Sequence, residues 1–265
     1  KEVNQNTDEL VTFGSDVDDE FKEIFLEEYE EELANLKQKY KAWKNAGKTE
    51  TTTTAINQLS KSDVQIVFTR DLFDGDAQII VTYLINGNGT VKVTNALKAL
   101  KGEHSNFYKF GNKLVLPETY KNITYYGKGP FEAYTDRQHA AKVGLYKQTI
   151  AEQYFPYIRP QENGNKLDVR WVALTKEDGS GIKILSEKPF SVSALNYSED
   201  DLSSGDEKTQ KHAGELDARK EVFVNIDGFQ QGIGSINSWG RLPLEKYRLS
   251  YKDYSYSYWM VPISK

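Results

Sequence analysis

The chain has 265 residues, a net charge of −5 and no cysteine, which excludes disulfides, thiolate metal sites and a cysteine nucleophile. Its basic residues are scattered rather than gathered in a stripe, and this pattern speaks against a nucleic-acid partner. No apolar run reaches the roughly 20 residues of a membrane-spanning helix, so no membrane partner is expected. Localisation stays open between cytoplasm and periplasm. Because the chain starts at Lys1, we expect a fragment or a processed product.

The first predicted element is a helix over residues 18–46. Hydrophobic side chains recur there at spacings of three and four, as expected for one face of a helix: Phe21, Phe25, Tyr29, Leu33, Leu36, Tyr40 and Trp43. Its acidic start and lysine-rich end complement the helix dipole, and Gly47 is a suitable stop. We expect the helix to pack on a sheet as part of an N-terminal extension, residues 1–47. The Thr-rich residues 48–55 fit either a strand or a connection.

Short runs of β-branched and aromatic residues follow, separated by turn residues such as Asn86-Gly87-Asn88-Gly89. Strands are predicted at residues 64–70, 78–84, 90–97, 113–117, 168–175, 182–187, 190–195, 222–227 and 254–261. Long loops are predicted at residues 125–164 and 228–242, and loops of this length are usually functional. Strands and helices do not alternate. The expected fold is therefore all-β, with antiparallel sheets packed face to face in one domain over residues 48–265.

Three turn-rich segments combine glycines, aromatic residues and polar groups. They are GKGPFEAYTDR at 127–137, YIRPQENG at 157–164 with DVRWV at 168–172, and NIDGFQQGIG at 225–234 with NSWG at 237–240. Together and in this order they resemble the C-terminal small-chain domain of glycoside hydrolase family 2 β-galactosidases. The resemblance covers roughly residues 40–261. It implies a large antiparallel β-sandwich of the galactose mutarotase-like type.

This resemblance also implies a division of work. A domain of this kind closes one side of the active site on a barrel domain, and the barrel supplies the catalytic acid and nucleophile. Retaining glycoside hydrolysis needs two carboxyl groups about 5 Å apart, and the sequence offers no recognisable pair. The parent enzyme is thus expected to hydrolyse terminal β-galactosides, whereas this chain alone is expected to be inactive, with no catalytic residue of its own.

The resemblance implies partners as well. These are a β-galactoside sugar, the barrel domain of the parent chain, and further copies of the parent in a homo-oligomer. No spacing in the sequence suggests a metal site, so no metal or other cofactor is expected in this domain. Any Mg²⁺ or Na⁺ would be bound elsewhere in the parent enzyme.

Trp239 is the first substrate-binding candidate, because its place in Asn237-Ser238-Trp239-Gly240 resembles that of a family tryptophan that stacks on substrate. An indole on a glycine-flanked loop can present its face to a sugar ring at low ordering cost. Asn237 and Ser238 are the polar candidates beside it. The chain departs from the family here, because Ile236 stands where an acidic residue is usual. The alternative is that Trp239 only plugs the end of the sandwich.

The segment at residues 127–137, which we call the mouth loop, resembles a family loop near the mouth of the active site. Its candidate site residues are Gly127, Gly129, Pro130, Glu132, Asp136 and Arg137. We expect positive φ at the two glycines and a structural latch at Asp136 and Arg137. A structural role is the alternative to a catalytic one for four carboxylates of the motif loops: Glu132, Asp136, Glu162 and Asp227. In that role they would bond to Arg137, Arg159, Arg170 or loop amides.

Two further functions stay open on the sequence alone. A stand-alone carbohydrate-binding module would use Trp239, Tyr125, Tyr126 or Tyr134 as a platform. An aldose 1-epimerase on the related mutarotase fold would need a histidine base, for which the candidates are His104, His139 and His212. The stretch around His212 resembles the galactosidase domain, so we do not interpret it as a mutarotase base.

Overall fold

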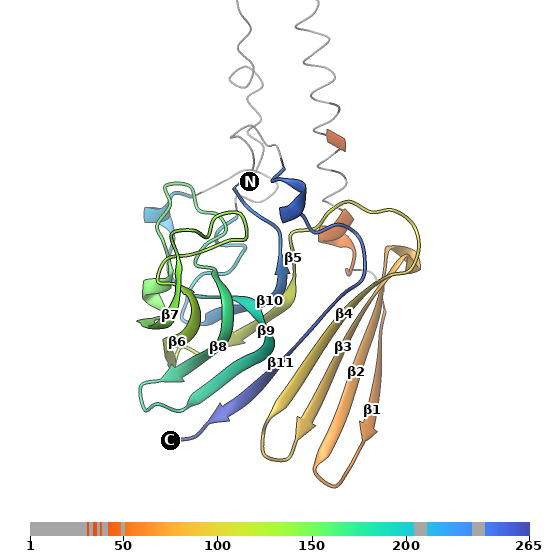
Figure 1. The fold of residues 1–265 in the computed structure, drawn as a ribbon, viewed down its shortest axis with the longest axis horizontal. Coiled ribbons are helices and arrows are strands. Elements are labelled where there is room, and N and C mark those ends of the chain that lie inside the picture. Colours follow the sequence, from red (N-terminus) through yellow and green to blue (C-terminus); the bar gives the residue numbers. More distant parts are fainter. Residues whose placement is uncertain are drawn as a thin grey trace, which may run out of the picture.

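The computed structural model describes residues 31, 34–35, 38, 42–48, 51–203, 211–234 and 242–265. Within them lie eleven β-strands and four short 3-10 helices (Figure 1). The strands are β1 (Thr52–Gln58), β2 (Asp63–Leu72), β3 (Ala77–Asn86), β4 (Val91–Ala99), β5 (Lys109–Leu116), β6 (Tyr120–Gly129), β7 (Lys142–Thr149), β8 (Lys166–Lys176), β9 (Gly181–Leu195), β10 (Val222–Gln230) and β11 (Tyr254–Ile263). The 3-10 helices are η1 (Phe73–Gly75), η2 (Ala151–Gln153), η3 (Ala213–Glu215) and η4 (Glu245–Tyr247).

These strands pair antiparallel throughout and form one hydrogen-bonded network. The main path runs β1-β2-β3-β4-β11-β9-β8-β6-β7, and β10 branches from β9 to reach β5. The length of β9 makes the branch possible, because its residues 181–185 pair with β11 and its residues 191–195 pair with β10. The all-β antiparallel class predicted from the sequence is confirmed.

The network curls over itself, so that β5 and β10 lie against the face of β4 and β11 (Figure 1). Asn112 on β5 marks this crossing. Its side-chain oxygen accepts hydrogen bonds from the amide of Asn95 on β4 at 2.8 Å and from the hydroxyls of Tyr256 and Tyr258 on β11 at 3.1 and 3.0 Å. This half-buried polar side chain has partners on two other strands and so helps to fix how the two layers sit. The layers of the predicted sandwich are thus parts of one curled sheet.

The main hydrophobic core fills the space between these layers. It is formed by buried side chains from β4, β6, β8, β9, β10 and β11, among them Val93, Ile123, Val172, Ile184, Val224 and Tyr258. Alternate residues of β10 (Val222, Val224 and Ile226) point into it. Burial of one such side chain stabilises the fold by about 1.5–3 kcal/mol, so this cluster is the main source of stability.

A second cluster lies at the end of the sheet near η1 and includes Trp43. The Trp43 ring lies 4.8 Å from the rings of Phe73 and Phe107, and its indole N–H donates to the Ser105 carbonyl at 2.9 Å. Residues 42–45 are helical, and Trp43 among them packs against this cluster. Most of the predicted helix over residues 18–46 lies outside the described residues.

Two predicted features of the chain needed correction. The predicted loop over residues 125–164 contains the second half of β6 and all of β7, so it is shorter than expected. The two strands predicted at 182–187 and 190–195 are one continuous strand, β9. Residues 52–55 of the Thr-rich stretch begin strand β1, which pairs with β2.

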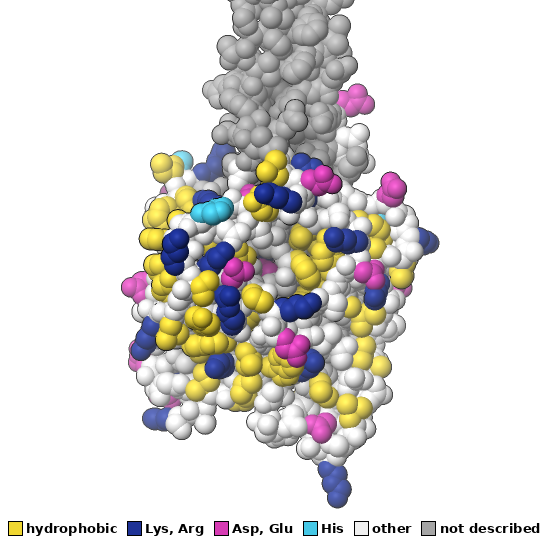
Figure 2. All heavy atoms as spheres, in the orientation of Figure 1, with side chains coloured by type: hydrophobic (Ala, Val, Ile, Leu, Met, Phe, Trp, Pro, Cys, Tyr) yellow, Lys and Arg dark blue, Asp and Glu magenta, His cyan; other side chains and the backbone are white. Residues whose placement is uncertain are grey.

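Outer surfaces of β6 and β7 are unusually apolar for a sheet edge. Tyr126, Val143 and Leu145 are all exposed, and Tyr126 stands opposite Leu145 in the β6–β7 register. Figure 2 shows hydrophobic side chains gathered over this part of the molecule, interleaved with Lys and Arg. Among the described residues, no helix is both long and apolar enough to cross a lipid bilayer.

Candidate functional site

The mouth loop, residues 127–137, begins within the last residues of β6. Gly127 and Gly129 lie in that strand, and neither has a positive φ, so the predicted conformation is wrong. The lack of room for a side chain explains why both residues are glycines. A Cβ on Gly127 would lie 2.9 Å from the Cα of Val169, and one on Gly129 would overlap the hydroxyl of Tyr125. The two glycines therefore let β6 pass close to its neighbours.

Pro130 follows β6 through a cis peptide bond, and the loop then brings Glu132 against the segment that leads into β8. The Glu132 carboxylate accepts hydrogen bonds from the guanidinium of Arg137, the hydroxyl of Tyr157 and, at 2.9 Å, the backbone N–H of Gly164. Its side chain is 11% exposed. These bonds to Arg137 and to a loop amide are the ones expected if Glu132 has a structural role rather than a catalytic one.

Asp136 ties the mouth loop to a segment about a hundred residues further along the chain. Its two carboxylate oxygens accept hydrogen bonds from the backbone N–H groups of Ile233 at 3.1 Å and Gly234 at 2.6 Å. The chain passes so closely that a Cβ on Gly232 would lie 2.6 Å from the Asp136 carboxyl carbon. Asp136 is therefore a latch, and its partners are these amides rather than Arg137.

A cavity of about 650 Å³ opens beside the mouth loop, between the loop, η2 and the residues after η2. We call it the Lys166 cavity. Its walls include Glu132, Gln153, Phe155 and Tyr157, together with Lys166 at the start of β8. It lies within the range of about 300–1,000 Å³ typical of small-molecule sites.

Lys166 is an unusual wall residue, because it is only 3% exposed and its ammonium group makes no ion pair among the described residues. Burial lowers the pKa of Lys166 to about 8, and the nearby Glu132 carboxylate only partly opposes this effect. A buried charge normally has a partner, so an unpaired lysine in a cavity is a candidate ligand-binding group.

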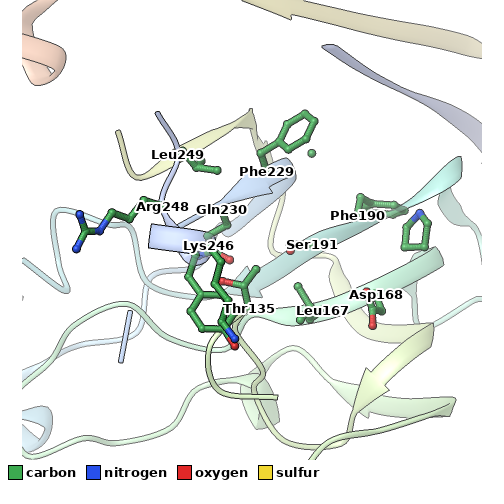
Figure 3. Close-up of a pocket in the computed structure, with 13 residues that line it drawn as sticks. Thr135, Leu167, Asp168, Phe190, Ser191, Phe229, Gln230, Lys246, Arg248 and Leu249 are labelled. Carbon is green, nitrogen blue, oxygen red and sulfur yellow. The ribbon is translucent and has the colours of Figure 1, made fainter. Parts of the chain in front are cut away.

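A second cavity, of about 280 Å³, is shown in Figure 3. Thr135 of the mouth loop, Leu167 of β8, Ser191 of β9 and Gln230 of β10 line it, and residues 246–249 close it. The mouth loop therefore borders both cavities.

Charged residues behind this second cavity include a buried acid, Asp227, which is 4% exposed. Burial raises the pKa of Asp227 to about 7, against the effect of the Lys109 ammonium group. Lys109 itself pairs with Glu162 at 2.7 Å, and Lys113 pairs with Glu199 at 2.6 Å. Asp227 and Glu162 are thus parts of a charged network inside the fold.

A family model described as "Beta galactosidase small chain" matches residues 16–260. The chain belongs to this family. The predicted relationship is thereby confirmed.

Curated relatives of this small-chain domain are β-galactosidases. The one from Priestia megaterium is 34% identical over 181 residues, which are 68% of this chain and 17% of the relative. β-Galactosidase BgaC from Bifidobacterium adolescentis is 32% identical over 214 residues (78% and 20%), and that from Streptococcus thermophilus is 27% identical over 225 residues (84% and 21%). The chain therefore spans about a fifth of the length of these relatives.

Solved structures resemble the small-chain domain only distantly. A galactose mutarotase related enzyme from Lactobacillus acidophilus gives a TM-score of 0.39 at 9% identity, covering 80% of this chain and 71% of that one. An aldose 1-epimerase homologue from Escherichia coli gives 0.39 at 8% identity, covering 80% and 69%.

Asn237, Ser238 and Trp239, the substrate-binding candidates of the small-chain domain, lie outside the described residues, and so does Ile236. The described part of the third motif ends at Gly234. The Asp136 latch therefore holds the chain three residues before Asn237.

The three histidines of the domain have separate surroundings. His104 lies 3.0 Å from Asp76 and stacks on Phe73, and the His212 ring nitrogen lies 3.3 Å from the Ile158 carbonyl. His139 lines the Lys166 cavity. Among the described residues no group of three or more acidic or histidine side chains could hold a metal ion.

The sequence did not indicate Lys166, Gln153 or Phe155 as site residues. A lysine at the start of a strand normally points to solvent, and nothing in the alternation of β8 marks Lys166 as buried. Phe155 stands in the aromatic run YFPY at residues 154–157, and this composition alone does not separate it from packing residues. The cavity that unites them depends on β7 and η2, in a region predicted to be a loop.

Proposed function

We propose that this domain forms part of the galactoside-binding wall of a β-galactosidase, with the catalytic acid and nucleophile on a barrel domain outside residues 1–265. The observation that carries the proposal is the Asp136 latch, because it joins the mouth loop to the segment that leads into Asn237, Ser238 and Trp239. The latch thus ties the mouth loop to Ile233 and Gly234, which in the sequence come shortly before the Trp239 motif. Family membership supports the galactoside as substrate.

Carboxylates of the mouth loop fit a supporting role better than a catalytic one. Retaining hydrolysis needs one carboxyl group to stay protonated and a second to attack, about 5 Å apart. Glu132 is held by a guanidinium, a hydroxyl and an N–H group, and Asp136 by two N–H groups. These contacts hold both carboxylates in place, as expected for structural residues.

Further parts of the proposal concern partners and cofactors. The partners are the barrel domain, a β-galactoside, and further copies of the parent enzyme, and the exposed apolar surface of β6 and β7 suits contact with another part of such an enzyme. Any Mg²⁺ or Na⁺ that the parent requires would be bound outside this domain.

Substitution of Trp239 in a β-galactosidase that contains this domain tests the proposal. Trp239→Ala is expected to raise KM for a chromogenic galactoside about fivefold, because one sugar-stacking contact is worth on the order of 1 kcal/mol. Trp239→Phe keeps an aromatic face and should recover most of the affinity. Thermal unfolding of both variants serves as the control for folding. An unchanged KM in Trp239→Ala would contradict the proposed role.

A further inference from the structure

Five charged side chains lie close together on the face of β5 and β10 that points away from the main core. They are Glu162, Lys109, Asp227, Lys113 and Glu199, and we call them the charge row. Lys109 pairs with Glu162 at 2.7 Å, and Lys113 pairs with Glu199 at 2.6 Å. Electrostatic interactions link Asp227 to all four. The charge row contains more acids than bases, so one acid has no base of its own.

Asp227 is this acid, and it lies between the two lysines. Its carboxylate sits directly over Gly111, where any Cβ would overlap Oδ1. Lys109 and Lys113 come two residues before and after Gly111 on β5, so all three project from one face of the strand. Asp227 is 4% exposed, and among the described residues its Oδ2 has no hydrogen-bond partner. Each lysine is thus near Asp227 but bonded to a glutamate instead.

The charge balance of the row depends on the proton of Asp227. While Asp227 is protonated, the two ion pairs leave the row neutral. Once this proton goes to solvent, two positive charges face three negative ones, and Asp227 has little water around it to solvate the excess charge. Burial raises the pKa of Asp227 to about 7, so the proton is lost near neutral pH. Burial also raises the pKa of the neighbouring Tyr256, which therefore stays protonated in this range.

Lys109 is the base best placed to compensate the charge of Asp227. Successive residues on one face of a strand are about 7 Å apart, and a lysine side chain spans this distance. The Lys109 ammonium group can therefore turn from Glu162 to Asp227, on which it acts more strongly than any other charged neighbour. Lys113 is less suited, because it and Glu199 are 43% and 51% exposed and water already screens their charges.

The Lys109–Glu162 pair holds the segment of residues 157–164 to β5. The two side chains are 21% and 25% exposed, so their bond is partly shielded from water. A second hydrogen bond to Glu162, from the Gln230 amide, is long at 3.5 Å. Departure of Lys109 would therefore leave Glu162 weakly held. The same segment carries Tyr157, whose hydroxyl donates to a carboxylate of the mouth loop.

We propose that loss of the Asp227 proton transfers Lys109 from Glu162 to Asp227 and so releases residues 157–164 from β5. The proton goes to solvent, and no other reactant takes part. The segment is held below neutral pH and released above it. This proposal concerns the domain alone, so it does not rest on the proposed function.

Double-mutant cycles on the 265-residue chain, measured by urea unfolding at pH 6 and pH 8, test the transfer. The first cycle combines Lys109→Met with Glu162→Gln. Their coupling is expected to change the unfolding equilibrium constant about fivefold at pH 6 and less than about twofold at pH 8. The second cycle combines Lys109→Met with Asp227→Asn. Its coupling should show the reverse pH dependence, because Lys109 contacts Asp227 only after the proton is lost.

The matched control is the outer ion pair of the charge row. A cycle of Lys113→Met and Glu199→Gln should give the same coupling at pH 6 and pH 8, because Lys113 keeps its partner. Circular dichroism checks that each variant folds. If Asp227→Asn does not fold, the Lys109–Glu162 cycle and this control still decide the question.

Amide hydrogen exchange shows whether the segment itself is released. Peptides that cover residues 157–164 are compared between the unmodified chain and Glu162→Gln at each pH, with residues 77–86 of β3 as the reference for global unfolding. At pH 6 the segment should exchange about fivefold more slowly in the unmodified chain than in the variant. At pH 8 the two rates should be equal, because the ion pair is then absent from both.

Three results would overturn the proposal. One is a Lys109–Glu162 coupling that is equal at the two pH values, because Lys109 would then not leave Glu162. Another is equal exchange of residues 157–164 in the unmodified chain and Glu162→Gln at pH 6, because the ion pair would then not hold the segment. The third is a control cycle that changes with pH as much as the first, because the effect would then not be specific to Lys109.

Discussion

Asp227 lies in the interior with one carboxylate oxygen that has no hydrogen-bond partner among the described residues. It sits directly over Gly111 of the paired strand β5, where any side chain would overlap it. Lys109 and Lys113 favour its charged form, whereas Glu162 and Glu199 oppose it. Burial decides the balance and raises the pKa of Asp227 to about 7.

This single carboxyl group should make the stability of the chain depend on pH. The folded state binds a proton between pH 3.8 and about 7 that the unfolded state has already released, so the free energy of unfolding falls as pH rises through this range. The slope is at most about 1.4 kcal/mol per pH unit and disappears above pH 7. Urea unfolding at pH 5, 6, 7 and 8 measures it. Asp227→Asn should remove this contribution.

The control for this prediction is Asp201→Asn. Two hydrogen bonds from Arg219 lower the pKa of Asp201 to about 2, so its titration is complete below pH 5. Asp201→Asn should therefore change stability by the same amount at all four pH values. A pH dependence that is unaltered in Asp227→Asn would show that Asp227 is not its source.

At the scale of elements, the mouth loop is held as one unit with the segment that follows β10. Asp136→Asn leaves one of the two N–H groups, those of Ile233 and Gly234, facing an NH₂ group instead of an acceptor. Loss of such a bond is expected to cost about 1–3 kcal/mol of stability. Amide hydrogen exchange at these two residues should become faster. The control is Asp168→Asn, which breaks a partly exposed ion pair with Lys128 and should cost less than about 1 kcal/mol.

Sequence patterns predicted strands such as β3 and β4 better than they predicted β6 and β7, which lie at one end of the strand order. Strands such as β3 and β4 alternate or carry β-branched runs bounded by the turn at residues 86–89, so their pattern was clear. The second half of β6 and all of β7 lie in the predicted loop over residues 125–164, and glycines interrupt both strands. Those glycines serve close packing of strands, as at Gly127 against Val169, and a sequence does not distinguish this role from a turn.

The sequence predicted only those residues of the candidate site that belong to a recognisable motif. The mouth loop followed from its glycine, proline and charge pattern, but the partners of Asp136 depend on two segments far apart in the chain. Lys166 was missed for the same reason, because its burial follows from the packing of η2 and the residues after it. Long-range contacts of this kind leave no local periodicity.

For the whole molecule, the proposed function requires that sugar contacts and bond cleavage belong to different domains. The small-chain domain would then contribute fixed walls, such as the latched mouth loop, while the rest of the enzyme supplies the reacting groups. This division agrees with relatives about five times as long as the matched region. It also explains why the described carboxylates of the mouth loop are bonded to donors within the domain.

The purified 265-residue chain is accordingly expected not to hydrolyse a chromogenic β-galactoside. Protonation of the leaving group and attack at the anomeric carbon need two free carboxyl groups on opposite sides of the bond, and Glu132 and Asp136 are each held by several donors. Release of the chromophore over several hours is the measurement. Glu132→Gln distinguishes the chain from a contaminating enzyme: turnover that disappears in this variant would place a catalytic group in the domain and contradict the proposed division.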